Sequence, residues 1–374
     1  MKRNACHIVT VGLFLLILAL VPLYWIIFPR KTFSDSERRY LSEPPKLSAA
    51  SLKDWSFDDA VETYLADQLP GRDALVGLNA YTVLFSGRQV SEEIWRDQEG
   101  YLVEAPIQAS ADQLTKRLSR IAALGEKTGL PVYVMAVPST GYVRRATLPL
   151  ALADLYAPEE LLLREIGSAP GITAVSLGET FLKEGQSWYY RTDHHWTGEG
   201  AYAAYRLFME TAGREALSYD DFYHHTVAGY VGSTRSRSAL WLAKGDTLTI
   251  DEPIDTQVRI TFSDDDRVYD SLFFYDHLTE YDWYPLFLDG NHPMTVVENL
   301  SAPADAPVLM LVKDSFGNTL APLMVPGYSK IVLVDPRYYR GSVSELCREQ
   351  GADEILFCYS LQRLATDLNL SILK

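Results

Sequence analysis

The chain has 374 residues, of which 47% are hydrophobic and 22% are charged, a composition typical of a globular protein with a real core. Its formal net charge of −15 argues against a nucleic-acid partner, because phosphate binding needs clustered Lys and Arg. The length allows one large domain, or one domain with an accessory segment.

The N-terminal segment 8–28 contains no charged residue. As a helix it would span about 30 Å, which is enough to cross a bilayer. Tyr24 and Trp25 lie near its far end, where aromatic rings favour a membrane interface. A cleaved signal peptide is the alternative, but no small-x-small cleavage site follows. The sequence therefore predicts a single-pass membrane anchor over residues 1–31, with the rest of the chain outside the cytoplasm.

Three cysteines are present, and Cys6 adjoins the predicted anchor. Cys347 and Cys358 lie in the globular part and could form a disulfide if this part is exported. Two buried thiols are the alternative, and the sequence leaves both open. No CxxC pair or zinc-like pattern is present.

The segment after the anchor divides into three parts. Residues 34–51 are polar with two consecutive prolines, which predicts an extended stalk. Apolar residues recur at helical spacing over 52–85, and Gly71 divides this stretch into two helices. A β-hairpin is predicted over 94–103. Together these parts form a predicted N-terminal region at residues 32–107.

From residue 108 onward, helical patterns alternate with short buried strands, as in a parallel α/β sheet. Helices are predicted at 109–129, 158–166 and 197–211. Strands of the sheet are predicted at 131–137, 171–177, 307–312, 331–334 and 354–359. A mixed region at about 218–306 interrupts the alternation, with strands predicted at 247–250 and 258–262. The pattern predicts a doubly wound, five-stranded parallel sheet with an insertion, in a domain spanning 108–374.

The candidate catalytic residues follow the ends of two predicted strands. Asp193 stands two residues before His195 in a loop that follows the predicted strand 171–177, and Ser315 follows the predicted strand 307–312. Open α/β sheets bind their ligands outside the carboxyl ends of strands. A serine needs an adjacent imidazole that a carboxylate holds in the correct tautomer. We therefore predict Ser315 as nucleophile, His195 as base and Asp193 as its partner, with the backbone N–H of Ser315 and those that follow it facing the oxyanion.

Each of these elements also has a plainer interpretation. Asp-Ser after a strand is a common helix N-cap, and an Asp-x-His pair in a loop is not specific by itself. The adjacent histidines at 194 and 195 could instead bind a metal with Asp193, if His224, His225 or His292 joined them. The preferred interpretation needs no metal and no cofactor.

Several motifs together resemble a known family. They are Asp193-His-His-Trp196, Ser36-Glu37-x-Arg39-x-Leu41, Asp67-x-x-Pro70-x-Arg72-Asp73, Gly290-Asn291, Lys313-Asp314-Ser315 and Asp335-x-Arg337-Tyr338-Tyr339. With this set the chain resembles the DHHW proteins, and more distantly the SGNH hydrolase-like domains of alginate O-acetyltransferases. The resemblance covers most of residues 34–374.

The resemblance implies a triad of Ser315, His195 and Asp193 that cleaves an ester or transfers an acyl group through an acyl-enzyme. Ordinary SGNH enzymes carry the serine after their first strand and the histidine after their fifth, whereas this chain has the reverse order. The order fits a circular permutation in which 131–137 and 171–177 are strands four and five.

On this permuted mapping, the usual oxyanion residues fall near 335–337 and 359–362. The signature Gly and Asn are absent there. Further candidates for substrate or oxyanion contacts are His194, Trp196, Asn291, Arg337 and Tyr359. For Arg337, an ion pair with Asp335 is the plainer interpretation.

The sequence thus predicts an extracytoplasmic SGNH-like serine esterase or O-acetyltransferase that acts on a cell-surface polysaccharide. A glycan acceptor and a multi-pass membrane protein that delivers acyl groups are the partners that the resemblance implies. One alternative is a metal-dependent hydrolase at the His pairs. Another is a non-catalytic module that binds glycan through aromatic residues of the insertion: Trp241, Phe273, Tyr275, Trp283 and Tyr284.

Overall fold

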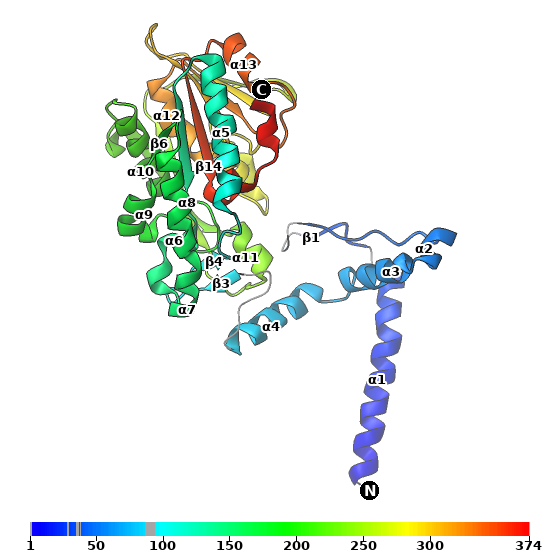
Figure 1. Cartoon of the computed structure of the whole chain (residues 1–374). Helices are drawn as coiled ribbons and strands as arrows, with labels where there is room; N and C mark the ends of the chain where they lie inside the picture. Colours follow the sequence, from blue (N-terminus) through cyan, green and yellow to red (C-terminus); the bar gives the residue numbers. More distant parts are fainter. Residues whose placement is uncertain (1, 28–29, 35–36, 38, 87–93, 374) are drawn as a thin grey trace. The chain divides into compact units, whose positions relative to one another are not determined.

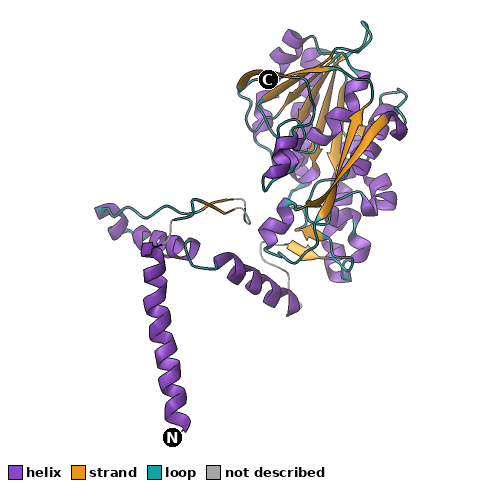
Figure 2. Cartoon of the chain, turned by 180° about the vertical axis from the view of Figure 1, so that it is seen from behind, coloured by secondary structure: helices purple, strands orange, loops and turns teal. Residues whose placement is uncertain are grey.

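The computed structural model describes residues 2–27, 30–34, 37, 39–86 and 94–373 (Figure 1). The chain forms two compact units. The N-terminal unit comprises Met1–Glu92 and Ser236–Leu242, and the sheet unit comprises Glu93–Arg235 and Ala243–Lys374. Helices dominate the N-terminal unit, and all strands of the large sheet belong to the sheet unit (Figure 2).

The N-terminal unit begins with helix α1 (Lys2–Ile27). Among the described residues, no helix combines the length and the apolarity that a membrane crossing requires. The membrane anchor predicted at residues 8–28 is therefore not supported, and Phe28 itself lies outside the described residues.

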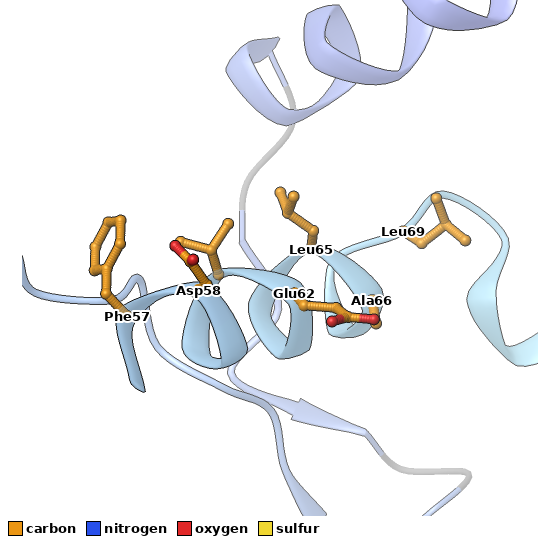
Figure 3. A pocket seen from close by; sticks show the side chains of 7 residues that line it. Phe57, Asp58, Glu62, Leu65, Ala66 and Leu69 are labelled. Atoms are coloured by element: carbon orange, nitrogen blue, oxygen red, sulfur yellow. The ribbon is translucent and has the colours of Figure 1, made fainter. Parts of the chain in front are cut away.

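Three further helices follow: α2 (Ala49–Lys53), α3 (Ser56–Asp67) and α4 (Arg72–Phe85). The predicted break at Gly71 is confirmed. Gly71 precedes α4 with a φ of 69°, which glycine adopts without steric cost. One side of α3 forms a mainly apolar groove (Figure 3), lined by Phe57, Asp58, Val61, Glu62, Leu65, Ala66 and Leu69.

Charged residues from two of the family motifs meet in this unit. Asp67 accepts hydrogen bonds from the Arg39 guanidinium at 2.5 and 3.1 Å and from the Ser42 N–H at 2.9 Å. Arg39 also pairs with Glu37 at 2.6 Å, and Arg72 pairs with Glu37 and lies 3.6 Å from Asp67. This charge cluster ties the short strands β1 (Phe33–Ser34) and β2 (Arg39–Tyr40) to α3 and α4. Ser36 of the same motif lies outside the described residues.

The sheet unit is built on an eight-stranded mixed sheet in the order β10-β9-β11-β13-β12-β14-β5-β6. Its strands are β5 (Val132–Val137), β6 (Thr173–Val175), β9 (Val258–Phe262), β10 (Asp265–Tyr269), β11 (Met294–Asn299), β12 (Val308–Lys313), β13 (Lys330–Val334) and β14 (Glu354–Ser360). The five neighbours β13-β12-β14-β5-β6 are all parallel. They are the five strands predicted from the sequence.

The predicted sheet of five strands is nevertheless smaller than the observed sheet of eight strands. Three strands of the insertion continue it beyond β13: β11 pairs antiparallel with β13, β9 with β11, and β10 with β9. An uncovered β13 edge would leave a row of unpaired N–H and C=O groups, and the insertion satisfies them. The other strands of the insertion, β7 (Phe222–Tyr230) and β8 (Asp246–Pro253), form a separate antiparallel ribbon.

The spatial order of the parallel strands fits the predicted permutation. If β12 is strand one, then β13, β14, β5 and β6 are strands two to five, and the observed neighbours read 2-1-3-4-5. In a doubly wound sheet of this order, ligands bind where the order reverses, next to strand one. The end of β12 therefore lies at the expected binding edge.

Helices cover both faces of the sheet, as a doubly wound fold requires. Alternate residues of β5 show this, since Val134 packs into one core cluster and Met135 into the other. Helix α5 (Ala111–Thr128) begins at a Ser110 capping box and ends at Gly129, which has a φ of 71°. The α5 core residues share the cluster of Val134 with α13 (Val343–Gln350) and α14 (Leu361–Thr366).

The opposite face is covered by α9 (Gly178–Glu184), α10 (Gly198–Thr211) and α12 (Gly317–Met324). Thr197 caps α10 as predicted, accepting a hydrogen bond from the Gly200 N–H. The remaining helices are α6 (Thr140–Val143), α7 (Leu150–Ala153), α8 (Ala157–Ser168) and α11 (Ser233–Ser238). The predicted hairpin is also confirmed, as β3 (Ile94–Arg96) paired with β4 (Leu102–Glu104). Cys347 and Cys358 are both buried, free thiols.

Candidate active site

The turn that carries Ser315 is shaped by its neighbour Asp314 at the carboxyl end of β12. One Asp314 oxygen accepts the Phe316 N–H at 3.0 Å, and the other accepts the Ser360 N–H at 2.8 Å. The second bond ties the end of β14 to the end of β12. The carboxylate thus fixes the local backbone so that Ser315 stands between the strand and α12.

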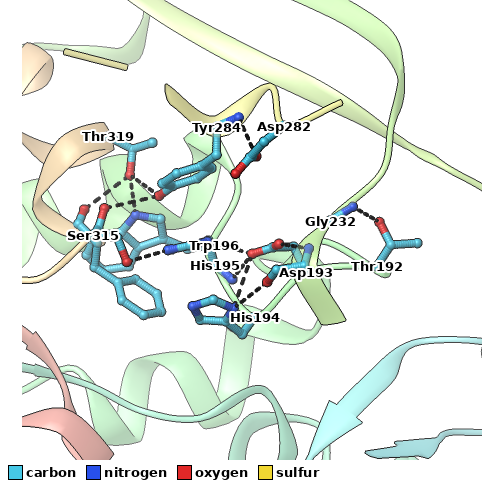
Figure 4. Close-up of polar contacts among 12 residues, drawn as sticks. Thr192, Asp193, His194, His195, Trp196, Gly232, Asp282, Tyr284, Ser315 and Thr319 are labelled. Atoms are coloured by element: carbon cyan, nitrogen blue, oxygen red, sulfur yellow. Dashed lines mark hydrogen bonds and ion pairs between the residues drawn. The ribbon is translucent and has the colours of Figure 1, made fainter. Parts of the chain in front are cut away.

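The structure brings Ser315 and the Asp193 loop together across 120 residues of sequence (Figure 4). His195 Nε2 lies 2.7 Å from Ser315 Oγ, and His195 Nδ1 lies 2.5 Å from Asp193 Oδ1. Asp193 is 1% exposed and His195 is 6% exposed, whereas Ser315 is only partly buried. The three side chains form a continuous hydrogen-bonded chain that leads from a buried carboxylate to a partly buried serine.

Asp193 is held by backbone donors as well as by the imidazole. Its Oδ1 accepts the His195 N–H at 2.9 Å, and its Oδ2 accepts the Ser233 N–H at 2.5 Å. A Cβ at Gly232 would lie 2.2 Å from the Asp193 Cβ, so glycine is needed there. Burial favours a higher pKa of Asp193, but the imidazoles of His195 and His194 and these hydrogen bonds outweigh it and hold the pKa well below its usual range. Asp193 is therefore ionised.

Burial lowers the pKa of His195, and the neighbouring His194 lowers it further. The Asp193 carboxylate opposes both effects without overcoming them. The imidazole is therefore neutral at neutral pH. Since Asp193 accepts at Nδ1, that nitrogen carries the proton, and Nε2 is left to accept from Ser315.

Tyr284 is a site residue whose position the sequence did not reveal. It belongs to the 3-10 helix η7 (Tyr284–Leu286) of the insertion, and its ring stacks on His195 at 3.8 Å with an interplanar angle of 15°. The sequence suggested this residue only as one of several sugar-stacking aromatics. No local pattern could have chosen it, because the contact depends on the path of the insertion.

Trp196 anchors the Asp193 loop instead of facing a substrate. The indole is fully buried, and its Nε1–H donates to Thr319 Oγ1 on α12 at 2.5 Å. Thr319 donates in turn to the Phe316 carbonyl at 3.2 Å. This position does not favour the expected substrate or oxyanion contact of Trp196, because the indole is buried and its N–H already donates to Thr319.

His194 is the exposed member of the motif. Its side chain is 31% exposed, and its ring centroid lies 4.0 Å from that of His195. The His194 Nδ1 atom lies 3.2 Å from Ser233 Oγ and 3.4 Å from Asp193 Oδ1. This partly exposed position next to the base is compatible with the predicted contact between His194 and a substrate.

Asn291 and Lys313 form a polar contact beneath the serine turn. The Lys313 ammonium donates to Asn291 Oδ1 at 3.0 Å and to Asn318 Oδ1 at 2.5 Å. Burial lowers the pKa of Lys313 to about 8, although Asp335 opposes this. The Asn291 oxygen is thus occupied, and the described residues show no hydrogen bond between Asn291 and Ser315.

Arg337 and Tyr359 complete the predicted candidates. Arg337 forms a two-pronged ion pair with Asp335, with Nε–Oδ1 at 2.9 Å and Nη2–Oδ2 at 2.5 Å, which matches the plainer interpretation. Tyr359 is 1% exposed, and its hydroxyl has no hydrogen-bond partner among the described residues. Tyr359 therefore lies in the core, a position that does not favour the predicted contact with a substrate.

The backbone N–H groups of the serine turn differ in availability. Phe316 donates to the Asp314 carboxylate, Gly317 to the Asp314 carbonyl, and Asn318 to the Ser315 carbonyl. Within the part of the chain that the structure describes, the Ser315 N–H has no acceptor. The Ser315 N–H is therefore the donor of this turn that is free to meet an oxyanion, whereas the N–H groups that follow it, which the sequence also suggested, are engaged.

The further histidines that the metal alternative named do not join the Asp193 loop among the described residues. His224 pairs with Asp251 at 2.7 Å, and His292 pairs with Asp264 at 2.7 Å, so neither joins Asp193. Over the described ranges, the group with metal-compatible spacing is Asp193, His194 and His195, whose ligand atoms lie within 4.8 Å of one another. The hydrogen bonds of the triad already engage Asp193 and His195.

Two of the five aromatic residues that the glycan-binding alternative names are buried. Phe273 and Tyr284 are buried, at 4% and 6% exposure, and cannot stack on a sugar. Tyr275 and Trp241 are about half exposed, and Trp283 is partly exposed.

Two family models match the chain. Residues 181–334 match the model of the DHHW proteins, and residues 92–239 match a model described as the SGNH hydrolase-like domain of the acetyltransferase AlgX. The resemblance that the motifs suggested is thereby confirmed. The first match contains the Asp193 loop and Ser315, and the second contains the Asp193 loop.

Solved structures share this fold. A DHHW family protein from Eubacterium siraeum has a TM-score of 0.64 and 21% identity, over 74% of this chain and 93% of that protein. PatB1 from Bacillus cereus has a TM-score of 0.63 and 23% identity, over 74% of this chain and 98% of PatB1. A structure of PatB1 with a sulfonyl adduct has a TM-score of 0.62 and 22% identity, over 75% of this chain and 98% of PatB1. No curated protein sequence matches the chain significantly.

Proposed function

We propose that this protein is an SGNH-like serine O-acetyltransferase or esterase that acts on a polysaccharide through an acyl-enzyme on Ser315. The observation that carries the proposal is the hydrogen-bonded chain from Asp193 through His195 to Ser315, at the binding edge of a 2-1-3-4-5 sheet. The match of residues 92–239 to an acetyltransferase domain supports acetyl as the transferred group.

In the first half-reaction, Ser315 Oγ attacks the carbonyl carbon of an acetyl ester. The Oγ–H proton passes to His195 Nε2, which lies 2.7 Å away, and Asp193 stabilises the imidazolium that forms. The negative charge on the carbonyl oxygen faces the Ser315 N–H. The bond from the carbonyl carbon to the donor oxygen then breaks, and the donor leaves with the proton from His195.

In the second half-reaction, an acceptor hydroxyl gives its proton to His195 Nε2 and attacks the same carbonyl carbon. The bond to Ser315 Oγ breaks, and the proton returns to the serine. If the acceptor is a sugar hydroxyl, the product is an acetylated glycan, whereas water gives acetate. The two activities use the same residues and differ only in the second nucleophile.

We further propose that this polysaccharide lies at the cell surface, so that the reaction takes place outside the cytoplasm. Transfer outside the cytoplasm requires an acetyl donor there. A multi-pass membrane protein that supplies acyl groups is accordingly the proposed partner.

The test is acetyl-ester turnover by wild type, Ser315→Ala and His195→Ala, each with and without an added polysaccharide. We expect both variants to lose about 10⁴-fold or more in kcat, because removal of one triad member disables the unit. Ser119→Ala, at an exposed position on α5, serves as the control and should match wild type. Acetylated polysaccharide would identify a transferase. Turnover by Ser315→Ala at the wild-type rate would overturn the proposal.

A further inference from the structure

The insertion places one aromatic ring directly on the candidate base. Tyr284 and His195 lie 3.8 Å apart between ring centroids, and their planes differ by 15°. In Figure 4, His195 lies between Tyr284 and His194. Phe316 packs against the imidazole from a third direction, at 4.9 Å and 55°. We propose that Tyr284 is a positioning residue, which holds His195 toward Ser315 and stabilises its charged form during acyl transfer.

This inference rests on the proposed function and specifies what the insertion adds to it. The imidazole must become an imidazolium in each half-reaction, when it takes the proton of Ser315 or of the acceptor. The face of an aromatic ring carries partial negative charge and attracts a cation that lies over it. A parallel ring at 3.8 Å therefore favours the charged imidazole, and it does so at the step where the charge appears.

The same contact restricts rotation of the imidazole. A ring flip of His195 would exchange its nitrogen and carbon positions and would break the bonds to Asp193 and Ser315 together. Tyr284 on one face and His194 on the other leave the ring little freedom to turn. Tyr284 thus preserves the geometry in which Nε2 faces the serine hydroxyl.

The ring of Tyr284 carries this role, and the hydroxyl contributes little. The Tyr284 hydroxyl lies 3.4 Å from the Ser315 carbonyl oxygen and 3.5 Å from Thr319 Oγ1. Both distances exceed the usual range for hydrogen bonds between oxygen atoms, which is about 2.5–3.0 Å. A phenylalanine at this position would keep the stacking surface and lose only these weak contacts.

The charges around His195 do not depend on Tyr284. The titratable groups that act on the imidazole are Asp193, His194 and Asp314. Burial raises the pKa of Tyr284 well above its ordinary value, so the phenol stays neutral. Replacing Tyr284 by Phe or Leu therefore changes no charge near the base. A change in kcat in such a variant can then be attributed to the loss of the hydroxyl or of the aromatic ring.

Phe287 supplies a matched control. Its ring lies 5.5 Å from that of Tyr284, it is equally buried, and it belongs to the same segment of the insertion. No ring contact links Phe287 to His195 among the described residues. A variant at this position disturbs the packing of the insertion without touching the base.

The experiment compares full-length wild type, Tyr284→Phe, Tyr284→Leu and Phe287→Leu. A fluorophosphonate that reacts with Ser315 counts the competent sites, and acetyl-ester turnover gives kcat for each counted site. We expect Tyr284→Leu to lower kcat about tenfold with KM unchanged, as expected for a cation–π contact. Tyr284→Phe and Phe287→Leu should stay within about twofold of wild type. Tyr284→Met provides a second apolar variant if Tyr284→Leu does not fold.

The outcomes separate this inference from the proposed function. If wild type is neither labelled nor active, the proposed function fails. If wild type is active and Tyr284→Leu and Tyr284→Met match it for each counted site, the role of Tyr284 is overturned. A Tyr284→Phe variant as slow as Tyr284→Leu would also overturn it, because the hydroxyl rather than the ring would then matter.

Discussion

Two buried side chains set the chemistry of the site at the scale of residues. Asp193 stays ionised because two imidazoles and several hydrogen bonds outweigh its burial, whereas His195 stays neutral because burial and His194 outweigh the carboxylate. The pair is thus prepared to accept a proton from Ser315 at neutral pH. His194 influences both groups without belonging to the hydrogen-bonded chain to the serine.

We expect the activity to persist into weakly acidic solution. The pKa of His195 is lowered from its ordinary value, so the imidazole remains a base below about pH 6.5, the ordinary histidine pKa. The acid side of the kcat/KM profile should therefore have an apparent pKa below that value. In His194→Gln this limb should move to higher pH, because the neighbouring imidazole no longer disfavours the charge on His195.

A control for this prediction is His225→Gln, at a side chain that is 52% exposed and pairs with Glu252 in the β7–β8 ribbon. Its kcat/KM profile should overlay that of wild type. An acid limb that stays in place in His194→Gln would show that His194 does not act on the base.

Whether a site residue could be predicted depended on whether its contact partners lie close to it in the sequence or at the end of a recognisable strand. Asp193 and His195 lie in one loop, and Ser315 follows a strand, so strand-end reasoning could bring them to one edge of the sheet. Trp196 stood in the same motif, yet its donor is used by Thr319 inside the core. Tyr284 reaches His195 only through the three-dimensional path of the insertion, which no periodicity encodes.

At the scale of elements, the parallel strands were predictable because each is a short apolar run followed by polar residues. The strands β9 and β11 of the insertion extend the sheet by antiparallel pairing. The sequence indicated β9 as a strand but not its neighbour, because antiparallel pairing across a long irregular segment leaves no local pattern. The N-terminal charge cluster was likewise visible only as two separate motifs.

The charge cluster predicts an acid-sensitive N-terminal unit. Hydrogen bonds from Arg39 are the largest effect on the pKa of Asp67 and hold it well below its ordinary value. This stabilisation is therefore present above the unfolded pKa of about 4 and is lost as the pH falls below it. Hydrogen exchange over residues 37–72 of the full chain, corrected for intrinsic rates, should accelerate below that pH. In Asp67→Asn it should already be fast at neutral pH.

Asp73→Asn is the matched control for Asp67→Asn. Its carboxylate is 52% exposed and lies 4.0 Å from the same Arg72 guanidinium, whereas the Asp67 side chain is 4% exposed. The control should exchange like wild type at neutral pH, since exposed ion pairs contribute little. Equal exchange in Asp67→Asn and Asp73→Asn would contradict a stabilising role of the charge cluster.

At the scale of the whole molecule, the order of the parallel strands fits the circular permutation that the resemblance to SGNH enzymes predicts. Circular permutation changes which strand comes first in the sequence and leaves the neighbours in the sheet unchanged. The end of β12 and the loop after β6 therefore supply Ser315 and His195 to one edge, although the histidine precedes the serine. The insertion then extends the sheet at one side and contributes Tyr284 to the site.

The fold class and the parallel strands could be predicted from the sequence, because buried strands and the polar residues at their ends form a local pattern. The anchor and the full extent of the sheet have no such pattern. The α/β class and the parallel core followed from alternating helices and strands. The expected anchor at residues 8–28 rested on the length and apolarity of the segment and on its flanking aromatic residues, and it found no support among the described helices. The extent of the sheet needed pairing information that a single sequence does not contain.

The central claim, that Ser315 becomes acylated, is tested most directly by intact-protein mass spectrometry of the full chain. Wild type and Ser315→Ala are mixed with an activated acetyl ester, quenched in acid during turnover, and then mapped by peptide digestion. We predict that wild type gains the mass of one acetyl group on Ser315 and that Ser315→Ala gains none. Acetylation of another residue in place of Ser315, or wild-type turnover by Ser315→Ala, would contradict the claim.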